Sequence, residues 1–174
     1  MGVHGSSTEK RIHIVLSDKD HVSALMEAAA NNHLDVMTLL TSSGGDVEAA
    51  ASSGVNALWL AASEGHDEIV KFLLEKGDLS PDVVRADGVS ALLAASTEGH
   101  VETVRILLEA GANVDAKDRD DITPLISTSE KGHTDIVELL LQKKATVDTF
   151  SVTEFSPLTL ACAHGHSEIV DKLL

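Results

Sequence analysis

Histidine is the residue type best placed to do chemistry in this sequence, because its imidazole binds metals and exchanges protons near neutral pH. Five of the nine histidines recur at a regular spacing: His33, His66, His100, His133 and His166. Four of these follow a glycine and one follows Asn32, so a repeated structural position explains them better than a metal site. His164 and His166 are two residues apart, unlike the i, i+4 pair of a zinc-binding helix, and Cys162 is the only cysteine. We therefore expect no metal and no cofactor.

The acidic residues and the cysteine form no catalytic pattern either. The sequence contains no Gly-x-Ser-x-Gly turn, no His-Glu-x-x-His motif and no phosphate-binding glycine-rich loop. Paired acids such as Asp67-Glu68 fall where helix starts and solvated turns carry them, which does not favour general acid/base catalysis. Cys162 is expected to be a small buried hydrophobic residue. We predict that the chain is not an enzyme.

Composition narrows the partners and the location. The sequence has 13 Lys and Arg against 28 Asp and Glu, a net charge of −15, and only 2% aromatic residues. This charge repels phosphate backbones, and few rings are present to stack on bases, so we expect no nucleic-acid binding. A single cysteine fits a reducing, cytoplasmic location. The longest early apolar run, Ile14-Val15-Leu16, is too short for a signal peptide, and no segment is long enough to span a membrane.

A repeat organises the chain. The spacing is 33, 34, 33 and 33 residues between Leu25, Leu58, Leu92, Leu125 and Leu158. Two residues before each leucine stands a helix-capping residue: Ser23, Asn56, Ser90, Thr123 and Ser156. A short helix then ends at glycine or asparagine, and a second helix with an acidic first turn and an apolar face follows. Lys144 stands where other copies end this second helix with glycine, so we predict that it has a strained positive φ. Neither helix buries its apolar face alone, so the copies must stack.

This period and its motifs resemble the ankyrin repeat family. The resemblance rests on Thr123-Pro124-Leu125, Ser156-Pro157-Leu158, the Gly-His pairs at Gly65, Gly99, Gly132 and Gly165, and Gly111-Ala112-Asn113-Val114-Asp115. It implies an all-α solenoid of stacked helix-turn-helix units with β-hairpin finger loops. It divides the chain into a lead-in with a partial finger at 1–20, repeats at 21–53, 54–87, 88–120 and 121–153, and an incomplete fifth repeat at 154–174.

The resemblance also implies a non-catalytic role, because ankyrin arrays usually bind proteins on the concave surface formed by their fingers and first helices. An apolar ladder flanked by acids at these positions favours a basic, partly apolar partner segment. The ladder consists of Val22, Val55, Val89, Ile122 and Phe155, and the acids are Asp20, Glu64, Asp87, Glu98, Asp120 and Glu130. An equally weighted interpretation is that the ladder seals each finger against its helix and the acids only aid solubility. Trp59 is either a binding anchor or a packing residue. The candidate partner-binding residues are Asp20, Val22, Val55, Trp59, Glu64, Asp87, Val89, Glu98, Arg119, Asp120, Ile122, Glu130, Lys131 and Phe155.

Two alternatives stay open. In the first alternative, the repeats are a regulatory or targeting part of a larger enzyme or channel. The fifth copy has apolar residues, such as Leu158 and Leu173, that favour a longer array and an open end that self-associates. In the second, the chain is a lipidated membrane-peripheral scaffold. The start of the sequence matches the N-myristoylation pattern with Gly2 as acceptor, although one acyl chain anchors only marginally.

Overall fold

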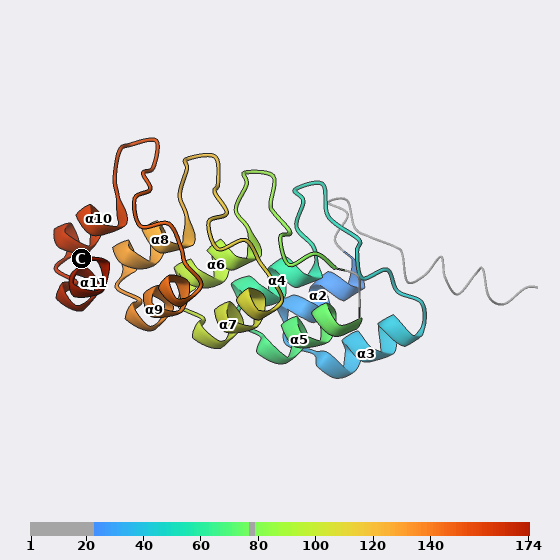
Figure 1. Cartoon of the computed structure of the whole chain (residues 1–174). Helices are drawn as coiled ribbons and strands as arrows, with labels where there is room; N and C mark the ends of the chain where they lie inside the picture. The colour runs from blue at the N-terminus through green and yellow to red at the C-terminus, as the bar shows by residue number, and fades with distance from the viewer. Residues whose placement is uncertain (1–22, 77–78) are drawn as a thin grey trace, which may run out of the picture.

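The computed structural model describes residues 23–76 and 79–174. These residues form five consecutive pairs of α-helices: α2 (Ala24–Ala30) with α3 (Leu34–Ser42), α4 (Ala57–Ser63) with α5 (Asp67–Lys76), α6 (Ala91–Glu98) with α7 (Val101–Glu109), α8 (Pro124–Lys131) with α9 (Thr134–Gln142), and α10 (Pro157–His164) with α11 (Ser167–Leu173). Figure 1 shows the pairs side by side in one row, with the first helices in one layer and the second helices in another. The fold is therefore an all-α repeat solenoid.

The local signals in the sequence set the ends of the first helices. Each predicted capping residue accepts a hydrogen bond through its side chain from the backbone N–H three residues later. This bond satisfies one of the N–H groups that the first turn leaves free. A residue with positive φ, between 58° and 83°, then turns the chain into the second helix: Asn32, Gly65, Gly99, Gly132 and Gly165. Both predictions from the sequence are confirmed.

The repeated histidine joins each helix pair to the pair before it. The Nε2 atoms of His66, His100, His133 and His166 donate to the backbone oxygens of Ala30, Ser63, Thr97 and Glu130, at 3.0, 3.1, 3.1 and 3.0 Å. Each of these oxygens lies at or near the C-terminal end of the preceding first helix, where carbonyls have no partner within the helix. These four histidines therefore have the structural role that their spacing predicted.

The core runs along the row between the two helix layers. Leu58, Leu92 and Leu125 are at most 1% exposed, and the main helix contacts join neighbouring pairs. Small side chains on the first helices let these helices approach closely: Ala29, Ala62 and Ser96 are fully buried. Stacking of neighbours therefore buries the apolar faces, as the repeat predicts.

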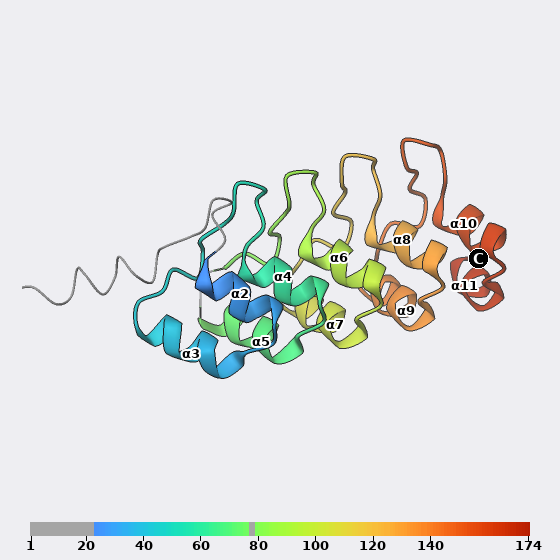
Figure 2. The same ribbon diagram turned by 180° about the vertical axis from the view of Figure 1, so that it is seen from behind.

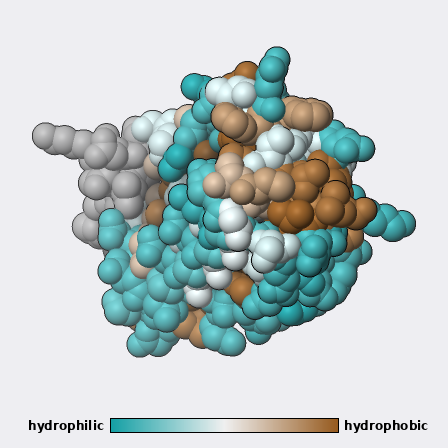
Figure 3. Space-filling view, turned by 90° about the vertical axis from the view of Figure 1, so that its left-hand side faces the viewer, coloured by the Kyte–Doolittle hydropathy of each residue, from teal (hydrophilic) through white to brown (hydrophobic). Residues whose placement is uncertain are grey.

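The C-terminal end of the row is less covered than the interior. Leu158 of α10 is only partly buried, and Figure 3 shows hydrophobic side chains gathered over part of this end. Cys162 is exposed, although the equivalent residues of the other repeats are fully buried. The prediction of a buried cysteine was therefore wrong. Burial at this position comes from the first helix of a following repeat, and no such helix covers α10 in the described structure.

Four connectors rise from the row as fingers (Figures 1 and 2). We number them first to fourth: residues 43–56, 79–90, 110–123 and 143–156. Isolated antiparallel bridges, Ala50 with Asn56 and Val84 with Ser90, close the first two fingers. One backbone bond links each finger to the finger before it: the N–H groups of Ala86, Arg119 and Val152 donate to the oxygens of Ser53, Asp87 and Asp120 at 2.6, 3.1 and 2.9 Å. These bonds hold neighbouring fingers in a fixed register.

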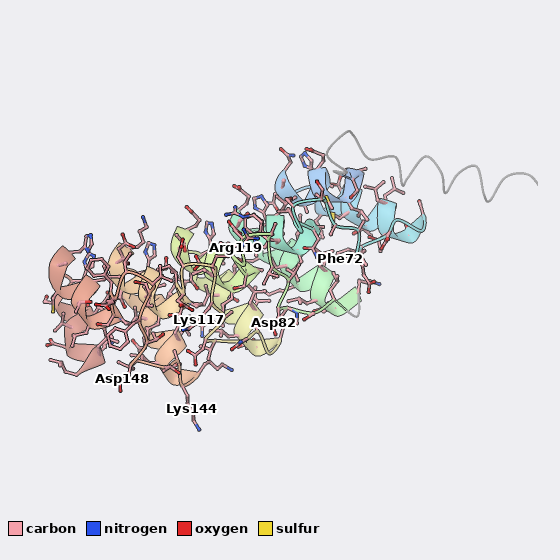
Figure 4. All side chains as sticks on the ribbon, turned by 90° about the horizontal axis from the view of Figure 1, so that it is seen from above. Phe72, Asp82, Lys117, Arg119, Lys144 and Asp148 are labelled. Carbon is pink, nitrogen blue, oxygen red and sulfur yellow. The ribbon has the colours of Figure 1, made fainter. Side chains whose placement is uncertain are left out.

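Lys144 has the positive φ that its place in the repeat predicts, with a value of 65°. Its side chain is exposed and points away from the array (Figure 4), so no contact compensates for the backbone strain. We expect Lys144→Gly to raise the free energy of unfolding by about 0.5–1 kcal/mol, because glycine adopts this conformation freely. Urea unfolding followed by circular dichroism measures the change.

Lys143→Gly is the matched control for Lys144→Gly. Lys143 has a φ of −88°, so glycine brings no relief of strain there and is expected to lower stability by a few tenths of a kcal/mol. Equal effects of the two substitutions would contradict the account of strain at Lys144.

Candidate protein-binding surface

A cavity of about 350 Å³ opens between the fingers and the first helices of three consecutive repeats. Its lining comes from α4, α6, α8 and the second and third fingers: Trp59, Ser63, Arg85, Val89, Leu93, Ala94, Thr97, Glu98, Asp118, Ile122, Ser127, Glu130 and Lys131. The volume is in the range of sites that hold small ligands or protruding side chains. The cavity therefore joins side chains of three repeats in one recess between fingers and first helices.

Two small side chains create this cavity. Ala94 of α6 and Ser127 of α8 each stand two residues after the repeat leucine, and both line the recess. The same position carries Leu60 in α4 and Leu160 in α10. At this position the row of first helices therefore has large side chains on α4 and α10 and small side chains on α6 and α8 between them. Sequence reasoning missed Ala94 and Ser127, although the change from leucine to a small residue at one repeat position was a readable signal.

Trp59 forms one wall of the cavity but is itself only 8% exposed. Its indole N–H donates to the backbone oxygen of Val89 at 2.9 Å, which ties α4 to the second finger. The guanidinium carbon of Arg85 lies 5.1 Å from the ring centroid, a distance typical of a cation–π contact. The indole donor and one ring face are thus already engaged within the chain, which favours the packing role over the anchor role.

Arg85 and Asp87 form an ion pair at the edge of the cavity. The Arg85 Nε atom lies 3.0 Å from both carboxylate oxygens of Asp87. These hydrogen bonds raise the pKa of Arg85 and lower the pKa of Asp87 to about 2, so both groups are charged at neutral pH. Asp87 therefore offers less negative charge to a partner than its sequence position suggested. Arg85, which the sequence analysis did not select, is the cause.

The remaining acids of the lining differ in how they are bound. Asp118 accepts through Oδ1 from the backbone N–H groups of Asp120 and Ile122, both at 2.9 Å, which shapes the third finger. Glu98 and Glu130 are exposed, and neither side chain pairs with a basic residue in the described part of the chain. These two carboxylates are free to interact with a bound partner.

The structure sorts the fourteen residues selected from the sequence into three groups. The cavity brings together Trp59, Val89, Glu98, Ile122, Glu130 and Lys131. Outside its lining lie Val55, Glu64, Asp87, Arg119, Asp120 and Phe155. Asp20, Val22 and the lipidation candidate Gly2 fall outside the described residues.

The apolar ladder is not uniform along the row. Val55 and Val89 pack against the core, the arrangement that a sealing role requires. Phe155, the corresponding residue of the fourth finger, is 49% exposed. The ladder therefore packs against the core at the first two fingers and leaves an apolar side chain exposed on the fourth.

Over residues 23–76 and 79–174, no group of three His, Cys, Asp or Glu side chains is arranged to hold a metal ion. Within the same ranges, no helix is long and apolar enough to cross a membrane.

Stacked helix pairs that are joined through hydrogen-bonded fingers define a helical repeat protein. The family model described as ankyrin repeats (3 copies) matches residues 25–118 and residues 113–174, so the chain belongs to the ankyrin repeat family. The chain is 43% identical over 61 residues to the ankyrin repeat and KH domain-containing protein mask-1 of Caenorhabditis elegans. That match covers 34% of this chain and 2% of the relative, so the chain spans only a small part of that protein.

Proposed function

We propose that this chain is a non-catalytic protein-binding module and that the cavity between α4, α6, α8 and the second and third fingers is its binding site. Ankyrin repeats are generally protein–protein interaction modules. The observation that carries the proposal is the recess of about 350 Å³, which spans three repeats and combines an apolar wall with two unpaired carboxylates.

A basic, partly apolar segment of a partner protein suits this surface best. Leu93, Ala94 and Ile122 supply apolar contact, and Glu98 and Glu130 supply negative charge beside it. The net charge of −15 attracts a basic partner over a longer range and speeds its association.

Ala94→Leu tests the location of the site. Leucine at this position would fill the cavity, and the fold accommodates leucine at the same position in α4 and α10. We expect binding of partner peptides to weaken at least tenfold, while the stability changes by less than about 1.5 kcal/mol. The peptides are selected from a random displayed library against the wild-type chain, which is immobilised through the thiol of Cys162, and fluorescence anisotropy measures their affinities.

Ala110→Leu is the matched control for the cavity-filling variant. Ala110 is exposed at the end of α7 and does not line the cavity, so the same added volume should leave binding unchanged. Peptides that bind the Ala94→Leu variant as tightly as the wild type would show that the binding site lies elsewhere.

A second candidate role is that of a targeting or regulatory segment within a larger protein. The Caenorhabditis elegans relative favours this role, because the matching stretch is 2% of its length and its name combines ankyrin repeats with a KH domain. An immunoblot of the endogenous protein would test it, since a product near 18.3 kDa would contradict a larger parent. Lipidation at Gly2, self-association through the C-terminal end and a cytoplasmic location stay predictions.

A further inference from the structure

The side chains of the cavity offer a partner more hydrogen-bond acceptors than donors. The indole N–H of Trp59 is bound to Val89, and two nitrogens of Arg85 are bound to Asp87. Within the described part of the chain, the carboxylates of Glu98 and Glu130 accept no hydrogen bond and form no ion pair, so both are free acceptors.

Three hydroxyl groups line the cavity, and their protons are bound within the chain. Ser63 donates its proton to the backbone oxygen of Leu60 at 3.0 Å. Thr97 donates its single hydroxyl proton to the backbone oxygen of Leu93 at 2.8 Å. The Thr97 oxygen lies 2.7 Å from the hydroxyl oxygen of Ser127, and it must therefore accept the Ser127 proton. Ser127 has no proton left for a ligand, but its oxygen can still accept a hydrogen bond, and the residue lines the cavity.

The unpaired charges of the lining have a negative excess. Arg85 is neutralised by Asp87, which leaves the carboxylates of Glu98, Asp118 and Glu130 against the single ammonium group of Lys131. A partner group that fills this cavity without leaving unpaired acceptors must therefore carry N–H donors and a positive charge.

The apolar part of the cavity lining favours an aliphatic stem next to that charged group. Ala94 and Ser127 leave empty the space that Leu60 and Leu160 side chains occupy at the same repeat position. Leu93 and Ile122 supply further apolar wall. A chain of methylene groups fits this gap, and long basic side chains bury their methylenes while their charged ends reach polar groups at the rim.

We propose that the cavity binds a long basic side chain of a partner protein, arginine in preference to lysine. Its methylene stem lies in the gap at Ala94 and Ser127, and its cationic end lies between Glu98 and Glu130. Arginine is preferred because its guanidinium group has five donors for separate acceptors, whereas the lysine ammonium group has three. This inference rests on the proposed function, since it specifies the residue that the same site recognises.

The test starts from the selected peptides whose binding is lost in the Ala94→Leu variant, because these peptides occupy the cavity. We expect them to share an arginine or a lysine. Replacing that residue with norleucine, which keeps an aliphatic stem without the charge, should weaken binding about tenfold. The Glu98→Gln, Glu130→Gln double variant should weaken the basic peptide by a similar factor and leave the norleucine peptide unchanged.

Glu75→Gln with Glu109→Gln is the matched control. Both glutamates are exposed near the ends of α5 and α7, lie outside the cavity and form no ion pair with the described residues. This double variant changes the net charge by the same amount, and we expect less than a twofold effect on binding. Equal weakening by the two double variants would mean that general charge attraction, and not recognition at the cavity, explains the preference.

The outcomes separate this inference from the proposed function. Cavity-dependent peptides that lack a basic residue, or that accept norleucine without loss, overturn the basic-side-chain inference and leave the proposed site in place. A selection in which every peptide binds the Ala94→Leu variant normally overturns the proposed site and this inference together.

Discussion

Gly65→Ala is expected to lower the free energy of unfolding by about 2–3 kcal/mol. Gly65 has a φ of 72°, a conformation that costs alanine about 1 kcal/mol. An added Cβ atom would lie 2.5 Å from Nδ1 of His100, so the imidazole must move. Its bond to the Ser63 oxygen, 3.1 Å long, would then be strained or lost. Chemical unfolding followed by circular dichroism measures the change.

Gly111→Ala separates the two causes. Gly111 has a φ of 90°, but a Cβ atom there meets nothing within 4 Å, so only the backbone cost of about 1 kcal/mol applies. Combining Gly65→Ala with His100→Ala removes the overlap, and the double variant should be more stable than the sum of the two single effects predicts. If Gly65→Ala costs no more than Gly111→Ala, the histidine contact between repeats does not restrict this position.

Trp59→Ala is expected to lower the free energy of unfolding by about 3 kcal/mol, because it leaves a large void beside α4 and removes one of the two hydrogen bonds that the Val89 backbone oxygen accepts. Trp59→Phe keeps most of the ring volume but removes the N–H donor, and a loss of about 1 kcal/mol is expected. Both values come from urea unfolding, and the same samples serve for peptide binding.

Binding by the Trp59→Phe variant distinguishes the two roles considered for this residue. A packing residue predicts less than a threefold change in affinity, whereas a binding anchor predicts more than a tenfold loss. A stable Trp59→Ala variant that loses all binding would contradict the packing role.

Part of the candidate site could be predicted from the sequence. The period placed Trp59, Val89, Glu98 and Ile122 on the face that contains the cavity, because residues at equal repeat positions share a face when the repeats stack. The recess itself was not predicted. It depends on two small side chains, Ala94 and Ser127, occupying the same position of consecutive first helices where α4 and α10 carry leucine, so it appears only when side-chain volumes are compared between copies.

The sequence by itself determined the features that act over a few residues. The capping bonds at the first helices and the positive φ at Asn32, Gly65 and Lys144 follow from local backbone chemistry, so each copy could be interpreted alone. The regular period of the copies also predicted that they stack, because a helix pair with one apolar face needs a neighbouring pair to bury that face.

Only the tertiary structure decided how charges and volumes meet across the repeat junctions. It placed His100 against Gly65, 35 positions earlier in the chain, and set Arg85 over Trp59 with Asp87 as its partner. It also left Cys162 exposed where equivalent residues are buried. Each outcome depends on which side chain lies opposite in the neighbouring repeat. The packing of two different copies sets the distance between the two side chains, and the sequence of one copy does not contain it.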